Sequence, residues 1–538
     1  MAEPLLDVRN LSVEFHTLAG IVPAVRNISY RLDRGETLAI LGESGSGKSV
    51  SSSAIMNLVD MPPGRIASGE ILLDGKDLLK MTPAERLEVN GRKIAMIFQD
   101  PLSHLNPVYT VGWQIREAMT AHGTPRGEAE AETLRLLGRV GIPEPERAMG
   151  KYPHEFSGGQ RQRVMIAMAL ALRPDLLIAD EPTTALDVTV QAEVLALLKE
   201  LQRETGMAIL IITHDLGVVA EIADRVVVME KGVLVESGTV REIYHAPKHA
   251  YTRKLIAAAP GKGDMHPPLA RREPLLTVRD VRKRYGAFEA LKGVSFDLAA
   301  GETLAIVGES GSGKSTLARV LLRLDEPDSG VAEWKGRDLF TLSPAELFRL
   351  RRDLQMVFQD PTQSLNPRMT VYQLISEAWV IHPDILPKSK WRARVAELLA
   401  QVGLSAEHMS RYPHQFSGGQ RQRIAIARAL ALEPKLIVCD EAVSALDVSV
   451  QAQVIALLDG LRRDLGISFI FIAHDLPVVR DFADQVMVMR RGEVVELGDV
   501  RQVFDAPREA YTQALLAASL DPDPEVQAAH RARRLEPA

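Results

Sequence analysis

The chain of 538 residues repeats itself, and this repeat limits its possible folds more than any other feature of the sequence. The eight residues GESGSGKS occur at 42–49 and again 266 positions later. Three further motifs, FQDP from Phe98, FSGGQRQR from Phe156 and ALDV from Ala185, each recur 260 positions later. So long and nearly constant an offset predicts two complete copies of one domain, because a stack of short repeats would have a much shorter period.

The domain boundaries follow from where the repeated pattern is interrupted. Residues 260–274 are rich in Pro and Gly, which neither extend a helix nor pair in a strand. We therefore place the first domain at 1–262, a linker at 263–274 and the second domain at 275–518. Residues 519–538 lack apolar periodicity, so we expect a disordered tail there.

Each half is predicted to be an α/β domain. Runs of branched apolar residues at 39–41 and 176–179 do not alternate with polar residues, which is typical of parallel strands buried on both faces. Matching runs occur in the second half at 305–307 and 436–439. Helical patterns such as 190–202 lie between these strands, and this alternation favours a parallel sheet covered by helices.

Composition excludes several classes of protein. Lys and Arg number 64 against 70 Asp and Glu, and the net charge of −6 does not favour a nucleic-acid-binding surface. Cys439 is the sole cysteine, so we expect neither a disulfide within the chain nor a cysteine-held zinc or iron–sulfur cluster. The first residues lack a secretory pattern and apolar stretches such as 164–172 are about half a membrane span, so we expect a protein that is neither secreted nor membrane-spanning.

The two GESGSGKS segments predict two nucleotide sites, because each follows a predicted strand and precedes a predicted helix. Glycines let successive backbone N–H groups curl around phosphate oxygens, the lysine reaches the phosphates and the serine hydroxyl binds Mg²⁺. The predicted loop residues are Gly42, Ser44, Gly45, Ser46, Gly47, Lys48, Ser49 and Val50, and in the second half Gly308, Ser310, Gly311, Ser312, Gly313, Lys314, Ser315 and Thr316.

A pair of acids follows an apolar strand in each half, at Asp180 and Glu181 and at Asp440 and Glu441. The carboxyl ends of parallel strands meet at one edge of the sheet, so these acids are expected beside the phosphate loop. The first acid of each pair suits Mg²⁺ binding and the second suits polarising a water molecule.

Both halves resemble nucleotide-binding domains of the ATP-binding cassette family, over nearly all of residues 5–515. The specific marker is SGGQ, since the phosphate loop alone is shared with many unrelated NTPases. The resemblance implies a P-loop NTPase fold with a helical signature subdomain in each half. It also implies these roles: Ser157, Gly158, Gly159, Gln160, Ser417, Gly418, Gly419 and Gln420 as signature residues that bind ATP, Gln99 and Gln359 as Q-loop residues near the metal and the attacking water, Asp187 and Asp447 as D-loop residues, His214 and His474 as switch histidines, and Phe15 and Tyr285 as adenine-stacking aromatics.

In this family each ATP lies between the phosphate loop of one domain and the signature of the other, which implies composite sites pairing Lys48 with Ser417 and Lys314 with Ser157. Both halves keep every catalytic residue type. The departures are small: Val50 stands where the second half has Thr316, and Ala442 where the first half has Pro182. We therefore expect both sites to hydrolyse ATP.

The segment HAPKHAYTRKL at 245–255, echoed by DAPREAYTQAL at 505–515, resembles the C-terminal segment of the oligopeptide, dipeptide and nickel importer ATPases; in the first half we place it at about 240–262. The motifs SLNP at 364–367 and RYPH at 411–414 support the same resemblance. The resemblance implies an ATPase that energises import of peptides or related small solutes from the cytoplasmic face of the inner membrane. It implies as partners two integral-membrane permeases and a periplasmic or extracellular solute-binding protein, and no nucleic acid.

Two other functions stay open. Tandem cassettes that act on ribosomes usually join their halves by a long charged helical arm, whereas the linker here is short and rich in Pro and Gly. Tandem ATPases of sugar importers commonly have an altered second site. The sequence does not identify the transported solute.

Overall fold

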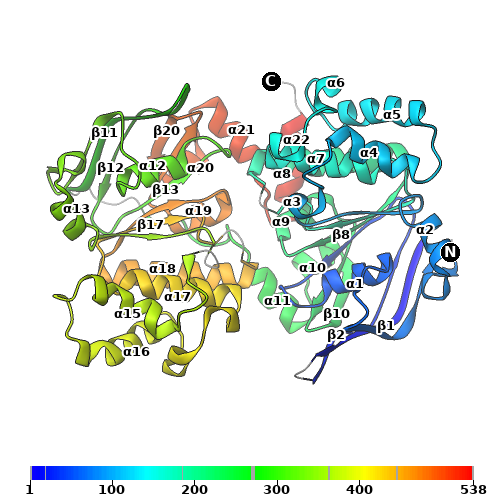
Figure 1. Cartoon of the computed structure of the whole chain (residues 1–538), viewed down its shortest axis with the longest axis horizontal. Helices are drawn as coiled ribbons and strands as arrows, with labels where there is room; N and C mark the ends of the chain where they lie inside the picture. Colours follow the sequence, from blue (N-terminus) through cyan, green and yellow to red (C-terminus); the bar gives the residue numbers. More distant parts are fainter. Residues whose placement is uncertain are drawn as a thin grey trace. The chain divides into compact units, whose positions relative to one another are not determined.

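The computed structural model describes residues 3–17, 20–184, 186–267, 273–360, 364–443 and 446–535. The chain forms two compact units (Figure 1): unit 1 comprises Met1–Ala259 and Leu520–Ala538, and unit 2 comprises Pro260–Ser519. The two units share the same order of strands.

The larger sheet of unit 1 has six strands in the order β10-β9-β3-β8-β7-β6. The five strands from β9 to β6 are parallel, and β10 pairs with β9 in the antiparallel sense. Every residue of β3, β7 and β8 is buried, as the absence of polar alternation predicted. The strands are β3 (Thr37–Leu41), β6 (Ile94–Ile97), β7 (Leu176–Asp180), β8 (Ala208–Thr213), β9 (Arg225–Glu230) and β10 (Val233–Thr239).

A smaller antiparallel sheet, in the order β2-β1-β4-β5, packs over the first sheet through one apolar core. Leu6, Val8 and Leu11 from the small sheet share this core with Ile40 and Leu210 from the large one. The strands are β1 (Leu6–Thr17), β2 (Gly20–Leu32), β4 (Gly64–Leu73) and β5 (Lys76–Asp77).

The helices of unit 1 include a group inserted between Gln99 and Ser157, where the sequence predicts the helical subdomain. In this group α4 and α5 pack on each other and on α7. The helices are α1 (Lys48–Met56), α2 (Pro83–Val89), α3 (Pro101–His104), α4 (Val111–Thr120), α5 (Arg126–Arg139), α6 (Pro145–Ala148), α7 (Gly158–Ala169), α8 (Val188–Thr205), α9 (Leu216–Ile222), α10 (Val240–His245) and α11 (Ala250–Ala257), with short 3-10 turns at Leu78–Lys80 and Pro153–Glu155.

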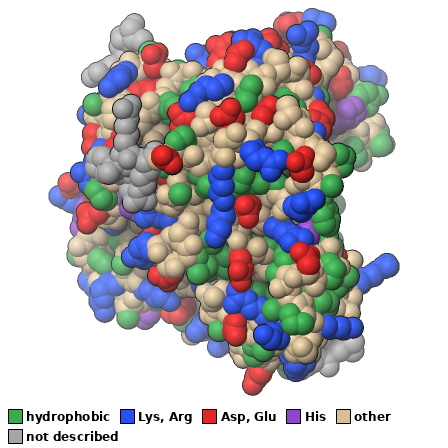
Figure 2. All heavy atoms as spheres, turned by 90° about the vertical axis from the view of Figure 1, so that its left-hand side faces the viewer, with side chains coloured by type: hydrophobic (Ala, Val, Ile, Leu, Met, Phe, Trp, Pro, Cys, Tyr) green, Lys and Arg blue, Asp and Glu red, His purple; other side chains and the backbone are tan. Residues whose placement is uncertain are grey.

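Unit 2 has the same two sheets, in the orders β16-β17-β18-β13-β19-β20 and β12-β11-β14-β15. Acidic and basic side chains are interspersed on the face in Figure 2, in keeping with the small net charge. Its strands are β11 (Pro274–Tyr285), β12 (Phe288–Ala299), β13 (Thr303–Val307), β14 (Ser329–Trp334), β15 (Arg337–Asp338), β16 (Leu354–Val357), β17 (Leu436–Asp440), β18 (Ser468–Ile472), β19 (Gln485–Arg490) and β20 (Glu493–Asp499). Its helices are α12 (Lys314–Leu321), α13 (Pro344–Leu350), α15 (Val371–Ile381), α16 (Trp391–Gln401), α17 (Gly418–Leu430), α18 (Val448–Leu465), α19 (Leu476–Phe482), α20 (Val500–Asp505) and α21 (Ala510–Ala518), with 3-10 turns at Leu339–Thr341, Lys388–Lys390, Ala406–Ser410 and Pro413–Gln415.

The prediction of a disordered tail is wrong for the described residues 519–535. Helix α22 (Pro524–Leu535) packs on α9 of unit 1, where Figure 1 shows it in red. The side-chain amide of Gln527 donates to the carboxylate of Glu221, and Arg534 lies 3.0 Å from the same carboxylate. Glu221 is 3% exposed, so the charge and hydrogen bonds of α22 compensate a buried acid.

Residues from Pro260 to Ser519, which include the end of the predicted first domain and the start of the predicted linker, belong to unit 2. The backbone N–H of Gly261 donates to Asp481 on α19 at 2.7 Å, and a ring nitrogen of His266 lies 3.1 Å from Asp484. Arg480 donates to the carbonyl of Gly263 at 2.9 Å. Linker residues 268–272 lie outside the described residues.

Candidate nucleotide sites

The phosphate loop of unit 1 joins the end of β3 to the start of α1 and requires glycine at its last position. Gly47 has φ +96°, and a Cβ there would lie 2.3 Å from the carbonyl oxygen of Ala24. In unit 2, Gly313 has φ +105° and its Cβ would lie 2.6 Å from the carbonyl oxygen of Ala290. Any larger residue would strain the loop and push it away from β2 or β12.

The loop lysine is folded back onto its own loop. Lys48 Nζ donates to the carbonyl oxygens of Gly42 and Glu43 at 2.7 and 2.9 Å. Lys314 makes the equivalent bonds in unit 2, both at 2.8 Å. The buried hydroxyl of Ser46 has no hydrogen-bond partner among the described residues. A buried ammonium group and an unsatisfied hydroxyl in one Gly-rich loop fit a phosphate ligand.

A serine hydroxyl and a carboxylate meet beside each loop. Ser49 Oγ donates to Asp180 at 3.2 Å, and Ser315 Oγ donates to Asp440 at 3.1 Å. Burial raises the pKa of Asp180 to about 6, and burial also raises the pKa of Asp440. This oxygen donor set fits Mg²⁺, which takes hard oxygen ligands and favours the ionised carboxylate.

Three polar side chains lie within hydrogen-bond distance of the second acid of unit 1. Glu181 lies 2.7 Å from the amide nitrogen of Gln99, 2.8 Å from Nδ1 of His214 and 3.0 Å from the hydroxyl of Thr184. Burial by itself raises the pKa of Glu181, but the hydrogen bonds from His214 and Thr184 and the charge of His214 outweigh it, and the pKa is lowered overall. Gln99 thus contacts the second acid, and its predicted role as a metal ligand stays a prediction.

The equivalent cluster in unit 2 is looser. Gln359 donates to Glu441 at 2.6 Å, but Nδ1 of His474 lies 3.8 Å from the nearest carboxylate oxygen. Both acids have a left-handed backbone, with φ +47° at Glu181 and +48° at Glu441. Such strain in a non-glycine residue is typical of functional sites.

The signature motifs begin helices. The Ser157 hydroxyl accepts from the N–H of Gln160 at 3.3 Å, and the Gln160 side chain accepts from the N–H of Ser157 at 3.0 Å. Ser417 and Gln420 make the same reciprocal cap on α17. A Cβ on Gly159 would lie 2.4 Å from Val190 on α8, so glycine is needed where α7 and α8 approach closely.

The other predicted residues are placed as follows. Asp187 caps α8 by accepting from the N–H of Val190 at 3.0 Å, and Asp447 stands at the same position before α18. Phe15 packs partly buried against the core of unit 1. Tyr285 is 46% exposed, with its hydroxyl donating to Asp325 at 2.6 Å. The ammonium group of Lys283 lies 5.2 Å from the centroid of this ring.

Two loop contacts were not predicted from the sequence. The hydroxyl of Tyr251 accepts from the N–H of Glu43 at 3.1 Å, and the hydroxyl of Tyr511 accepts from the N–H of Glu309 at 3.4 Å. The available signal was the tripeptide AYT, which is repeated in the two C-terminal segments.

Comparison with known proteins decides the family. The model of the ABC transporter family matches residues 25–184 and 291–444. The chain belongs to this family. A second family model, described as the C-terminal region of oligopeptide/dipeptide transporters, matches residues 235–277 and 495–538 of this ABC protein. The chain therefore has the predicted fold of two tandem cassettes, and it is an ATPase that binds ATP with Mg²⁺.

Curated relatives span nearly the whole ABC protein. It is 50% identical over 556 aligned positions to the glutathione import ATP-binding protein GsiA of Escherichia coli (strain K12), covering 96% of this chain and 89% of the relative. GsiA of Shigella boydii serotype 4 gives the same identity and coverage. Among solved structures, cbiO1 from Clostridium perfringens, part of the ABC transporter complex cbiONQ, is 33% identical with a TM-score of 0.40, covering 44% of this chain and 92% of that chain. The helices of the described residues include none long and apolar enough to cross a membrane.

Proposed function

We propose that this chain is the ATP-hydrolysing subunit of an importer for peptides or related small solutes, acting at the cytoplasmic face of the inner membrane. The observation that carries the proposal is the peptide-transporter C-terminal region, which follows the cassette in both halves. The 50% identity to proteins named for glutathione import supports the same class and makes glutathione the first solute to test.

In the proposed site of unit 1, different residues bind the phosphates, hold the metal and accept the proton. Lys48 and the loop N–H groups hold the phosphates, while Ser49, Asp180 and Gln99 hold Mg²⁺, which neutralises phosphate charge when bound. Glu181 accepts the proton of the attacking water, and its lowered pKa keeps it ionised near neutral pH. The matching residues in unit 2 are Lys314, Ser315, Asp440, Gln359, Glu441 and His474.

His214 is proposed to orient Glu181, because its ring nitrogen lies 2.8 Å from the carboxylate. The 3.8 Å separation of His474 and Glu441 makes the second histidine less able to orient its acid. We therefore propose that both sites hydrolyse ATP and that the first does so faster.

We further propose that each ATP is shared between the units, Lys48 acting with Ser417 and Lys314 with Ser157. Both signature serines precede helices of at least twelve residues, whose N-terminal N–H groups attract anions. Ser157 and Ser417 are exposed, so their helix starts are open to a ligand.

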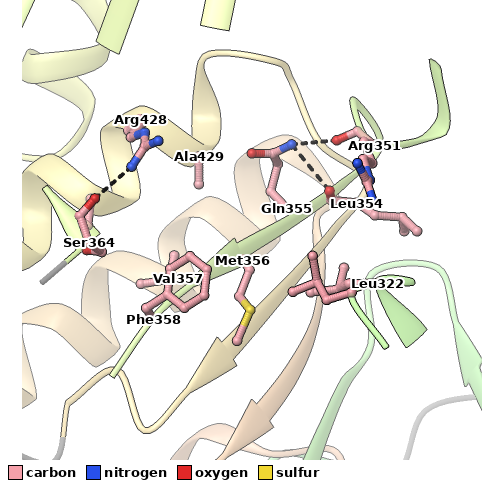
Figure 3. A pocket seen from close by; sticks show the side chains of 12 residues that line it. Leu322, Arg351, Leu354, Gln355, Met356, Val357, Phe358, Ser364, Arg428 and Ala429 are labelled. Carbon is pink, nitrogen blue, oxygen red and sulfur yellow. Dashed lines mark hydrogen bonds between the residues drawn. The ribbon is translucent and has the colours of Figure 1, made fainter. Parts of the chain in front are cut away.

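The permease partners are proposed to dock beside the Q-loop. In unit 2 a groove there is lined by β16 and α17, with Phe358, Met356 and Ala429 as its apolar wall (Figure 3). Arg428 at its edge donates to the carbonyl of Ser364, and Phe358 is 45% exposed. A short amphipathic helix from a permease fits a groove with an apolar floor and a polar rim.

The test begins with affinity purification of the tagged chain from gently solubilised native membranes, with mass spectrometry of its partners. Two multi-span permeases and a solute-binding protein are expected. Uptake of labelled glutathione and dipeptides is then compared between cells with the native chain and cells with the Lys48→Ala, Lys314→Ala double variant, which should lose uptake. Ribosomal proteins without any permease would overturn the import proposal.

A further inference from the structure

The C-terminal segment of each unit reaches back to its phosphate loop. In unit 1 the contact is made by Tyr251 on α11, a side chain only 8% exposed. Its hydroxyl accepts from the backbone N–H of Glu43, the second residue of the loop, at 3.1 Å. The two residues are separated by 208 positions in the sequence, so the contact depends on how the segment is anchored.

The segment is anchored by a carboxylate just before α11. Glu236 on β10 accepts from the N–H of Lys248 at 2.7 Å and from the N–H of His249 at 3.0 Å. These two bonds fix the start of α11 to the edge strand of the large sheet. The tyrosine that meets the loop therefore stands on a fixed support.

The backbone of Glu43 is hydrogen-bonded at both its N–H and its carbonyl oxygen. Tyr251 bonds its N–H, and Lys48 bonds its carbonyl oxygen at 2.9 Å. When Lys48 turns toward the phosphates of a nucleotide it must give up that carbonyl, whereas the bond that Tyr251 accepts uses the N–H of Glu43 and can persist. Tyr251 can thus hold the loop in shape while the lysine changes partners.

We propose that Tyr251 is a positioning residue that keeps the phosphate loop in its nucleotide-binding shape, and so makes ATP affinity depend on the C-terminal segment. Preorganisation of a loop lowers the ordering cost of binding, so its loss weakens binding of ATP. A displacement of α11, for instance by a protein bound to this segment, would move the hydroxyl of Tyr251 away from Glu43 and so lower the affinity of the loop for ATP. The inference rests on the proposed role of this loop as the ATP site.

Unit 2 repeats the arrangement in a weaker form. Tyr511 on α21 accepts from the N–H of Glu309 at 3.4 Å. Glu496 accepts from the N–H of Arg508 at 3.0 Å and of Glu509 at 3.2 Å, as Glu236 does in unit 1. Because this tyrosine is more exposed and its bond longer, its hydroxyl should matter less than that of Tyr251.

The experiment measures the dissociation constant for Mg·ATP with a fluorescent ATP analogue on the full chain, in a Lys314→Ala background that leaves only the first site. Tyr251→Phe removes one hydroxyl and keeps the ring, and it should weaken binding about fivefold, the usual effect of one lost hydrogen bond. Tyr244→Phe is the matched control, since it removes a buried hydroxyl bond from the same segment without touching the loop. It should leave binding unchanged.

Steady-state ATP hydrolysis adds a second readout. Tyr251→Phe should raise the KM for ATP about fivefold and leave kcat near the control value, because saturating nucleotide restores the loop. Equal binding by Tyr251→Phe and Tyr244→Phe, or a fall in kcat with KM unchanged, would overturn the inference. Lys48→Ala tests whether this loop is the ATP site. If that variant binds Mg·ATP normally, the assignment of the loop fails. If it does not bind, the result for Tyr251→Phe supports or overturns the role of the tyrosine alone.

Discussion

Replacing Asp180 by asparagine should stabilise the nucleotide-free protein, although it removes a proposed magnesium ligand. The side chain is 7% exposed at the end of β7, and burial raises its pKa from an ordinary 3.8 to about 6. A buried acid with a raised pKa costs folding free energy whenever it is ionised. Asparagine keeps an oxygen that can accept from Ser49 but carries no charge to bury.

The sign and size of this change in the free energy of unfolding follow from proton linkage. Between pH 3.8 and about 6 the folded state binds more protons at Asp180 than the unfolded state, so the free energy of unfolding falls as the pH rises. Above pH 6 the full cost is present, about 3 kcal/mol, at about 1.4 kcal/mol for each pH unit between the two pKa values. At pH 5 roughly half of this cost remains.

Differential scanning calorimetry in EDTA is the assay. At pH 8 Asp180→Asn should raise the unfolding temperature of unit 1 by roughly 6–10 °C, the shift expected for about 3 kcal/mol in a unit of this size. At pH 5 the gain should be about half as large. Asp440→Asn is the matched variant, since burial raises the pKa of that acid too, and it should shift the transition of unit 2.

With magnesium and ATP present, the native protein should unfold at a higher temperature than the Asp180→Asn variant, because these ligands stabilise the native protein far more. An unchanged or lowered unfolding temperature of that variant at pH 8, or a gain of equal size at pH 5 and pH 8, would refute the reasoning that burial of this charge destabilises the nucleotide-free protein.

Three further outcomes are expected. Glu181→Gln and Glu441→Gln should each slow ATP hydrolysis, with the larger loss from Glu181→Gln, and the double variant should retain under roughly 1% of turnover; an unchanged rate in both single variants would refute their role. Gly159→Ala should lower the free energy of unfolding by about 1–3 kcal/mol through its clash with Val190, and the added change Val190→Ala should restore most of it, as urea denaturation can check. Deletion of residues 520–538 should destabilise unit 1 by about 3 kcal/mol, because it strips the partners from buried Glu221, and Glu221→Gln should reduce this loss in limited proteolysis.

The elements that were predictable from the sequence are those encoded by contiguous residues. The phosphate loops could be located because a Gly-rich stretch after a strand has few other physical explanations. The acids at Asp180 and Asp440 followed from the rule that parallel strands present their carboxyl ends at one edge. In both units the structure brings the first acid within hydrogen-bond distance of the loop serine.

The features that escaped prediction depend on contacts between distant residues. Helix α22 is amphipathic, but its many charged residues concealed this signal, and its partner Glu221 lies 306 positions from Gln527 in the sequence. The bond from Tyr251 to the loop spans 208 positions. The motifs around His214 and His474 differ at the preceding residue, Thr213 against Ala473, but this difference does not predict that the histidine–glutamate distances of the two units differ.

The docking of α22 on α9 bears on how the protein is made. Residues 520–535 are translated after all of unit 2, about 300 codons later than α9. At about 5–20 residues per second, α9 waits roughly 15–60 s on the ribosome before Gln527 and Arg534 can meet Glu221. Through that interval the nascent first cassette must keep an unpaired carboxylate at a surface that is later buried. Slow completion of this kind makes the first cassette the part of the nascent chain most in need of chaperone protection, and the last to become resistant to proteases.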